Sequence, residues 1–415
     1  MTYSTLTLSI LRNYQINQAP RLSMRSNSAV VPQRYVYGGV LIGVAMMAAL
    51  LWMPSMLGAL ARGYGLGVEP LGRLASVELI GFLWGSLFTS NRTIAQLVKW
   101  VFIGCVLIAA ANIAVLQMTM HLPFMALRLI AGFGAGIGFG YGLKICAMSA
   151  GPTLSFGMFT GSMSMVMIVG FQIVAHLIES RAGGAGAGEA EILQGVARTV
   201  FGIYASLAVA AALVFLANRP PGVPANGVAE LKRHGFPAPL VLIGLLAIVL
   251  AFVGQGGVWA FLQTLGISHG FTVSGVANAM SAFAIMGILG SLAAGIAPQR
   301  IPRWRPIAVA LLFLYGGLYA LYSPRSLAWY VAGCAVGGFY WNFILPLILG
   351  LLARIDETGR GSVLGGTMSS VGSAVGPLLA GQFIRGMDYR PAGLLAGGLC
   401  FISLVCVWCI ERGRR

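Results

Sequence analysis

The acidic residues of this chain are few enough to be placed one by one. The sequence has 415 residues, of which 10 are Asp or Glu. Only Glu78 lies inside a long apolar run, "LGRLASVELIGFLWGSLF" (71–88). A carboxyl group in apolar surroundings favours its neutral form and ionises when water or a positive charge reaches it. Glu78 is therefore a candidate for reversible proton binding, and the alternative is a structural carboxyl that stays protonated or paired with an arginine.

Three of the basic side chains in apolar runs could act with Glu78 or extend to a membrane interface. Arg128, in "RLIAGFGAGIG" (128–138), is a counter-charge for Glu78 or for an anionic substrate, because a guanidinium can bind a carboxylate through two hydrogen bonds. Near a helix end it could instead extend to the interface, as we expect for Lys99. His176 follows Gln172 by one helical turn and could join a proton relay, although it is also near the expected end of its helix.

The composition predicts a protein dissolved in lipid. Hydrophobic residues make up 58% of the chain and charged residues 9%, with a mean hydropathy of +0.86. Soluble domains carry about 25% charged residues, so this chain could not cover a surface facing water. The net charge of +16 is spread between apolar runs, which indicates basic loops on a membrane protein and no nucleic-acid partner.

Apolar runs long enough to cross a bilayer occur twelve times, and none shows the alternation of a barrel strand. The fold class is therefore an all-α integral membrane protein with twelve transmembrane helices. The expected spans are 36–60, 71–90, 95–119, 123–145, 155–178, 197–217, 239–263, 273–296, 306–323, 326–352, 362–384 and 391–410.

Basic residues orient these spans. With the N-terminus inside, the cytoplasmic side carries 17 Lys and Arg and the opposite side carries 7, which predicts that both termini are cytoplasmic. The expected organisation is a cytoplasmic tail (1–34), a six-helix half (35–217), a Pro- and Gly-rich linker (218–238), a second half (239–412) and a short tail (413–415). Residues 1–23 contain no span and are expected to be dispensable, with Met24 as an alternative start.

Short stretches recur at one fixed distance. "GSMSMV" (161–166) returns as "GTMSSV" (366–371), "GSL" (85–87) returns at 290–292, and Gly132 falls on Gly337, each 205 positions later. Three pairs of expected spans thus share one offset, which predicts two parallel copies of a six-helix unit. Such repeats are an arrangement of alternating-access transporters.

With twelve expected spans and a six-helix repeat, the chain resembles the major facilitator superfamily over about residues 35–412. Its "RLIAGFGAGIG" looks like the Arg-x-x-x-Gly-x-Gly signature of that family. The family's loop motifs are retained only in Gly85 and Arg92 after the second span, and in Gly290, Arg300 and Arg303 after the eighth, without the acidic residue. The incomplete loop motifs leave the subfamily open, and the absence of the Gly-Pro signature of drug antiporters from the fifth span counts against a drug exporter.

The resemblance implies that the second, fifth, eighth and eleventh spans line a seam between the halves. Glu78 would then be a proton carrier at the seam, with Arg128 as its partner. Candidate residues for the substrate cavity are aromatic or polar, and others suit helix packing and gating. The cavity candidates are Trp52, Tyr141, Gln172, His176, Gln255, Trp259, Gln263, Asn278, Tyr340, Trp341, Asn342, Ser369 and Ser370. The packing candidates are Gly81, Gly85, Gly132, Gly136, Gly290, Gly376 and Pro377.

These features favour a secondary transporter that moves a small organic solute together with protons, by symport. We expect the protein to be a monomer in the inner membrane. The substrate is expected to be aromatic or anionic. The alternatives are a drug efflux antiporter and a non-transporting membrane receptor. No enzyme, cofactor or metal is expected, because the pair Cys406 and Cys409 lacks further ligands and the GxGxxG within 132–142 lies inside an apolar span.

The topology can be tested with a reporter that is active only outside the cytoplasm. A fusion after Gly184, in an expected external loop, should be active, and a fusion after Gly227, in the linker, should be silent. Activity at the second site, or silence at the first, would contradict the predicted orientation.

Overall fold

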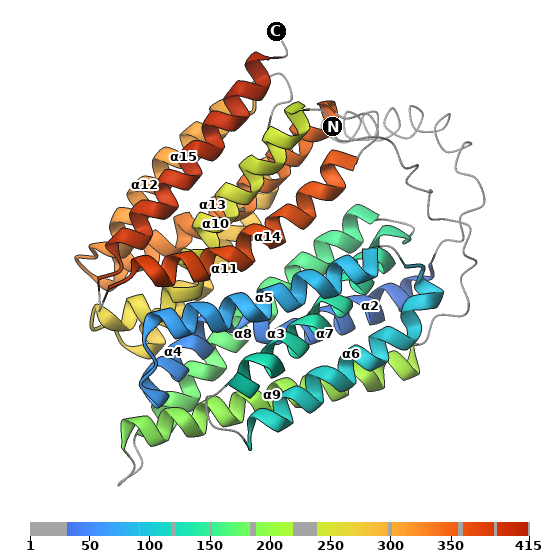
Figure 1. Cartoon of the computed structure of the whole chain (residues 1–415), viewed down its shortest axis with the longest axis vertical. Helices are drawn as coiled ribbons and strands as arrows, with labels where there is room; N and C mark the ends of the chain where they lie inside the picture. The colour runs from blue at the N-terminus through green and yellow to red at the C-terminus, as the bar shows by residue number, and fades with distance from the viewer. Residues whose placement is uncertain are drawn as a thin grey trace, which may run out of the picture.

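The structure, a computed structural model, describes residues 31–90, 92–117, 122–149, 152–182, 188–218, 239–297, 301–355, 360–385 and 388–413. The tail before residue 31 and the linker 219–238 lie outside the described residues. Within those ranges the chain is helical (Figure 1). The helices are α2 (Gln33–Met46), α3 (Ala48–Leu51), α4 (Met53–Tyr64), α5 (Val68–Ser90), α6 (Ile94–Val115), α7 (Leu122–Ala147), α8 (Pro152–Ala182), α9 (Glu189–Ala217), α10 (Pro239–Ser268), α11 (Val273–Ile296), α12 (Trp304–Tyr322), α13 (Leu327–Ile355), α14 (Arg360–Phe383) and α15 (Arg390–Arg412).

Ten of these helices are long and apolar enough to cross a membrane, namely α5 to α13 and α15. They match ten of the twelve expected spans, so the chain is a multi-pass membrane protein. The expected span 362–384 forms α14, which is 24 residues long but rich in Gly and Ser. The expected span 36–60 corresponds to α2, α3 and α4 in succession.

The first expected span is broken because of its local sequence. Pro54 stands at the start of α4, where a proline has no N–H to continue the helical ladder. The backbone turns at Met47 and at Trp52, which separate the short α3 from its neighbours. The break was not predicted. It allows α3 and α4 to present Ala49, Met53 and Met56 to the interior of the N-terminal half.

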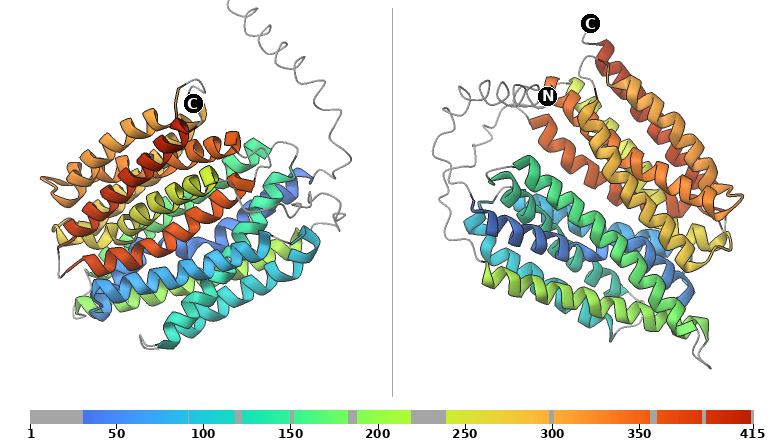
Figure 2. Two further views of the ribbon diagram at one scale, coloured as in Figure 1. Left: turned by 45° about the horizontal axis from the view of Figure 1, so that its top comes forward. Right: turned by 180° about the vertical axis from the view of Figure 1, so that it is seen from behind.

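The helices form two groups that lie side by side, α2–α9 and α10–α15 (Figures 1 and 2). Within the first group α5 packs along α7, and within the second α11 packs along α13. These two pairs are related by the repeat offset, so the same close packing occurs once in each half. Contacts between the halves are made chiefly by α5 with α14, α8 with α11, and α4 with α10.

Glycines allow α5 and α7 to approach backbone to backbone. A side chain at Gly81 or Gly85 would collide with the carbonyl oxygens of Leu129 or Phe133 on α7. In return, a side chain at Gly132 or Gly136 would collide with carbonyl oxygens on α5, those of Glu78 and Phe82.

The other packing candidates also lie at close helix approaches. Gly290 of α11 faces the Phe339 carbonyl of α13. Gly376 of α14 faces the Val253 carbonyl of α10, and the carbonyl of Pro377 faces Gly72 of α5. Gly290, Gly376 and Gly72 therefore have no room for a side chain.

The two halves are in contact at one end of the seam and apart at the other. At the end where α5 begins, α14 meets α5 at Gly72 and Gly381, and the two helices diverge along their length (Figure 1). Toward the other end, Gly157 and Gly161 of α8 and Gly366 of α14 face open space. The seam is thus closed at the end that carries the α4–α5 and α10–α11 connections.

Substitution of Gly132 tests the importance of the α5–α7 contact. Gly132→Ala is expected to lower the melting temperature of the purified protein, because the added Cβ forces the helices apart at a cost of about 1–3 kcal/mol. Gly202→Ala on α9 is the control, because open space surrounds that position. Equal melting temperatures for the two variants would contradict a tight α5–α7 contact.

Candidate functional site

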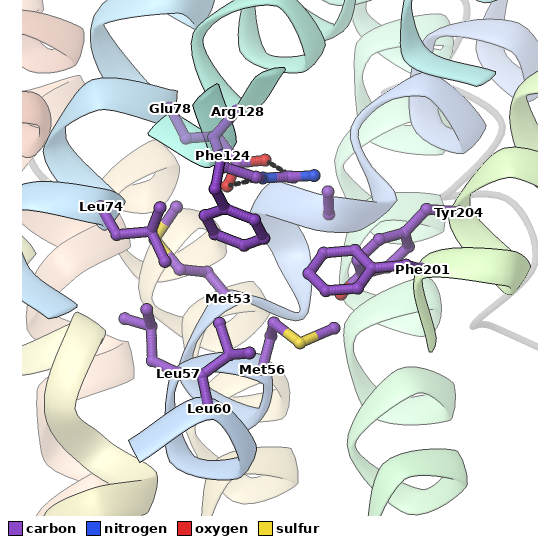
Figure 3. Close-up of a pocket in the computed structure, with 11 residues that line it drawn as sticks. Met53, Met56, Leu57, Leu60, Leu74, Glu78, Phe124, Arg128, Phe201 and Tyr204 are labelled. Carbon is purple, nitrogen blue, oxygen red and sulfur yellow. Dashed lines mark hydrogen bonds and ion pairs between the residues drawn. The ribbon is translucent and has the colours of Figure 1, made fainter. Parts of the chain in front are cut away.

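Glu78 and Arg128 form an ion pair inside the N-terminal half. Glu78 lies on α5 and is 6% exposed, whereas Arg128 lies on α7 and is 3% exposed. Arg128 Nε donates to Glu78 Oε2 over 3.2 Å, and its Nη2 group donates to Oε1. Figure 3 shows the two side chains meeting at the edge of a cavity. Both oxygens of the carboxylate are bound, which makes this a two-point, charge-assisted contact.

A third member of the site, Asn112 on α6, was not anticipated. Its Oδ1 accepts a hydrogen bond of 2.8 Å from Arg128 Nη1, and its Nδ2 donates to the Ile108 carbonyl over 2.7 Å. The side chain is fully buried. Donation to Ile108 turns the oxygen toward the guanidinium, so Asn112 holds Arg128 from the side opposite Glu78. The feature of the sequence that could have identified Asn112 is its polar amide within the apolar run 95–119.

An aromatic ring completes the surroundings of Arg128. Phe201 of α9 lies with its ring centre 5.4 Å from Arg128 Cζ, within the range of a cation–π contact. Phe201 also lines the cavity together with Tyr204, which was not anticipated either. The guanidinium therefore contacts a carboxylate, an amide and a ring, each from a different helix.

The close α5–α7 packing places the pair. Because a glycine at 132 lets the Glu78 backbone lie directly against α7, the carboxylate needs only a short reach to the guanidinium one turn earlier on α7. Glu78 therefore lies inside the N-terminal half, rather than at the seam between the halves as we expected. Although α5 does line the seam, its residue 78 points toward α7.

Two of the cavity candidates in the N-terminal half are packing residues. Trp52 is 2% exposed, donates from Nε1 to the Val166 carbonyl over 2.8 Å, and lies 5.5 Å from the ring of Tyr204. Tyr141 is 1% exposed and packs edge-on against Phe215. Both side chains join helices within that half.

Gln172 lies at the seam. Its Nε2 donates to Asn278 Oδ1 over 3.0 Å and to Ser281 Oγ over 3.2 Å, which links α8 to α11. Glu179 of α8 accepts a hydrogen bond from the backbone N–H of Ser274, at the start of α11. His176 is exposed. Polar contacts therefore join the halves at their closed end.

Aromatic side chains gather where α8, α10, α11 and α13 meet. Trp259 lies 4.8 Å from Phe283 and 5.9 Å from Phe171, and Trp341 lies 5.2 Å from Phe252 and 6.3 Å from Phe283. We call these five residues the ring cluster. Trp259 and Trp341 are only half-buried, so the cluster presents ring surface to the seam.

The remaining cavity candidates lie on α10, α13 and α14. Gln255 and Gln263 are 4% and 3% exposed, and their Nε2 atoms have no hydrogen-bond partner among the described residues. Tyr340 is buried, and Asn342 donates to the Gly338 carbonyl over 3.3 Å. On α14, Ser369 donates to the Gly366 carbonyl of its own helix, and Ser370 is half-buried.

Comparison with known proteins identifies the fold. No family model matches the sequence, and no curated protein matches it. Among solved structures, the nucleoside transporter NupG matches at a TM-score of 0.67 and 13% identity, over 91% of this chain and 99% of that one. A variant of NupG with one aspartate replaced by alanine matches at a TM-score of 0.71 and 14% identity, with the same coverage. The chain has the major facilitator fold.

The neighbours are transporters and not enzymes, and at 13–14% identity the likeness concerns the fold. Within the described residues, no group of three or more His, Cys, Asp or Glu side chains could hold a metal ion. The chemistry that the described site offers is the binding and release of a proton at a carboxylate, together with the charge of one guanidinium.

The two charges of the pair differ in what each can do alone. Glu78→Gln leaves a buried arginine that stays charged, whereas Arg128→Gln leaves a carboxyl that can become neutral by taking up a proton. Because breaking a buried pair costs about 3–5 kcal/mol when the remaining charge is uncompensated, Glu78→Gln should lower the free energy of unfolding more than Arg128→Gln. Thermal unfolding of both proteins in one detergent measures the difference.

The double variant Glu78→Gln with Arg128→Gln removes both charges, so it should regain part of the stability lost by Glu78→Gln alone. The reverse order of the two single variants would show that the guanidinium is compensated without Glu78.

Proposed function

We propose that this protein is a proton-coupled secondary active transporter of a small, uncharged aromatic solute. The observation that carries the proposal is the buried pair of Glu78 and Arg128 in a membrane protein with the major facilitator fold. An intramembrane ionisable residue is costly, with a penalty of about 2.5–3.5 kcal/mol or more, and such residues commonly mark proton or substrate pathways.

Protonation of Glu78 would weaken its bond to Arg128, because the neutral carboxyl no longer attracts the guanidinium as an ion. Arg128 keeps its contacts with Asn112 and Phe201, so it need not leave the site. The consequence falls on α5, which packs on α7 through Glu78 and on α14 at the closed end of the seam. Proton binding in one half can therefore alter the contact between the halves.

The arrangement of the halves fits alternating access. We propose twelve spans, formed by α2–α4 together and by α5 to α15 singly, with both termini in the cytoplasm of a cell whose inner membrane holds the protein. In that orientation the closed end of the seam faces outward and the open end faces the cytoplasm. The structure then represents the state that exchanges substrate with the cell interior.

The ring cluster supports an aromatic substrate. Flat ring surfaces at Trp259 and Trp341 suit a planar solute, and the amides of Gln255 and Gln263 suit hydrogen bonding to it. Arg128 is already engaged by Glu78 and Asn112, which favours an uncharged solute over an anion. Nucleosides meet this description, and NupG is a nucleoside transporter.

The solute for transport assays can be chosen from a panel of nucleosides, nucleobases and other uncharged aromatic compounds. The measurement is the rise in melting temperature that each compound gives to the purified protein. A ligand of the folded state at 100 times its dissociation constant contributes about 2.7 kcal/mol of stability. The compound that stabilises most then serves as the labelled solute in proteoliposomes.

Glu78→Gln is expected to exchange this solute across the membrane at an unimpaired rate and to fail to accumulate it when a pH difference is imposed. The amide preserves the shape of the side chain but cannot release a proton. Glu69→Gln is the matched control on the same helix, since Glu69 is exposed and forms a surface pair with Arg73, and it should accumulate solute normally. The Glu78→Gln, Arg128→Gln protein controls for loss of folding. Full accumulation by Glu78→Gln would contradict the proposal.

A further inference from the structure

Tyr204 has a buried hydroxyl beside the ion pair whose role the pair does not explain. Tyr204 lies on α9, is 2% exposed, and its hydroxyl has no hydrogen-bond partner among the described residues. Figure 3 shows the side chain reaching from α9 toward the cavity that Glu78 and Arg128 line. A buried hydroxyl without a partner costs about 1–3 kcal/mol, so this position calls for a partner.

The ring of Tyr204 is held in place. Trp52 lies 5.5 Å away on one side and is itself fixed by its hydrogen bond to Val166. Phe201 lies 6.1 Å away and contacts Arg128 with its own ring. The hydroxyl is therefore directed into the cavity by packing.

The cavity has room for about one water molecule. Its walls are apolar except for three residues, Glu78, Arg128 and Tyr204. The apolar residues are Ala49, Met53, Met56, Leu57, Leu60, Leu74, Phe124 and Phe201. A buried water needs two to four polar partners, and these three residues provide them.

Among the polar residues that line the cavity beside Glu78, Tyr204 is the one that suits proton transfer. Arg128 only donates hydrogen bonds and does not lose its proton. Both polar atoms of Asn112 are engaged, with Arg128 and with Ile108. A phenol and a water molecule can each donate and accept, so a proton can pass between them without either gaining a lasting charge.

We propose that this cavity binds one water molecule, which Tyr204 positions and which delivers protons to Glu78. In the loading step the water gives one proton to the carboxylate and receives another from solvent water at the same time. The carboxylate becomes a carboxyl group, and the bound water and Tyr204 are unchanged. The inference rests on the proposed function and adds that protons reach Glu78 within the N-terminal half, apart from the seam.

Infrared difference spectra of the protein in bilayers after a pH jump can follow the protonation of Glu78 without any substrate. The carboxyl band that is absent from Glu78→Gln belongs to Glu78. Tyr204→Phe, which removes only the hydroxyl, should slow the rise of this band about 100-fold, the scale of a lost proton-transfer group. Tyr204→Phe should also change the ratio of the rates of this rise in H₂O and D₂O. A substitution that only perturbed the packing would leave this ratio unchanged.

Tyr141→Phe is the control, because Tyr141 is equally buried but packs on Phe215 away from the cavity, and it should behave as the parent. Ala49→Val provides a second test, since it fills the cavity while retaining Tyr204, and it should slow the band as well.

An unchanged rate in Tyr204→Phe, or in Ala49→Val if the first variant does not fold, would overturn the relay alone. If the parent shows no carboxyl band that depends on Glu78, the proposed proton coupling fails, and the relay fails with it.

Discussion

The burial of one carboxylate beside one guanidinium within the membrane is the constraint on which the rest of this structure depends. Each charge would be costly alone, and together they are acceptable only with full hydrogen bonding. The protein meets this requirement with an amide from α6 and a ring from α9 around Arg128. Four helices of the N-terminal half, α5, α6, α7 and α9, thus converge on a single ion pair.

The ion pair lies at the tight, glycine-rich contact between α5 and α7. The backbones of residues 78 and 132 are in direct contact, so α5 and α7 lie close together where the carboxylate meets the guanidinium. Helix α5 also meets α14 of the other half at Gly72. The C-terminal half contains the equivalent α11–α13 contact but no buried charge pair at Gly333, the position equivalent to Arg128. The buried ion pair thus lies in the N-terminal half, whereas the two half-buried tryptophans, Trp259 and Trp341, lie in the C-terminal half.

Part of this picture could be predicted from sequence because charge is scarce in apolar runs. Glu78 and Arg128 stood out for that reason, and the structure joins them. The repeated Gly residues indicated close helix contacts. The direction of Glu78 could not be predicted, because a helix with glycines on one face packs tightly without revealing which neighbour it packs against. Here Gly81 and Gly85 pack against α7, whereas Gly72 packs against α14 of the opposite half.

Other features could not be recovered from sequence for related reasons. The role of Tyr204 depends on two rings from distant parts of the chain, and an aromatic residue in an apolar helix carries no signal of its own. Trp52 and Tyr141 were cavity candidates by residue type, yet they fill space within one half. The break in the first span follows from Pro54, but a proline inside an apolar run does not by itself show how the helix will bend.

The most direct test of the central claim is to record proton movement itself. Proteoliposomes with a trapped pH indicator would be given the stabilising solute on one side only, with no pH difference at the start. The account predicts that the parent protein moves protons together with the solute, whereas Glu78→Gln passes the solute and leaves the internal pH unchanged. Equal proton movement in both proteins would contradict a coupling role for Glu78.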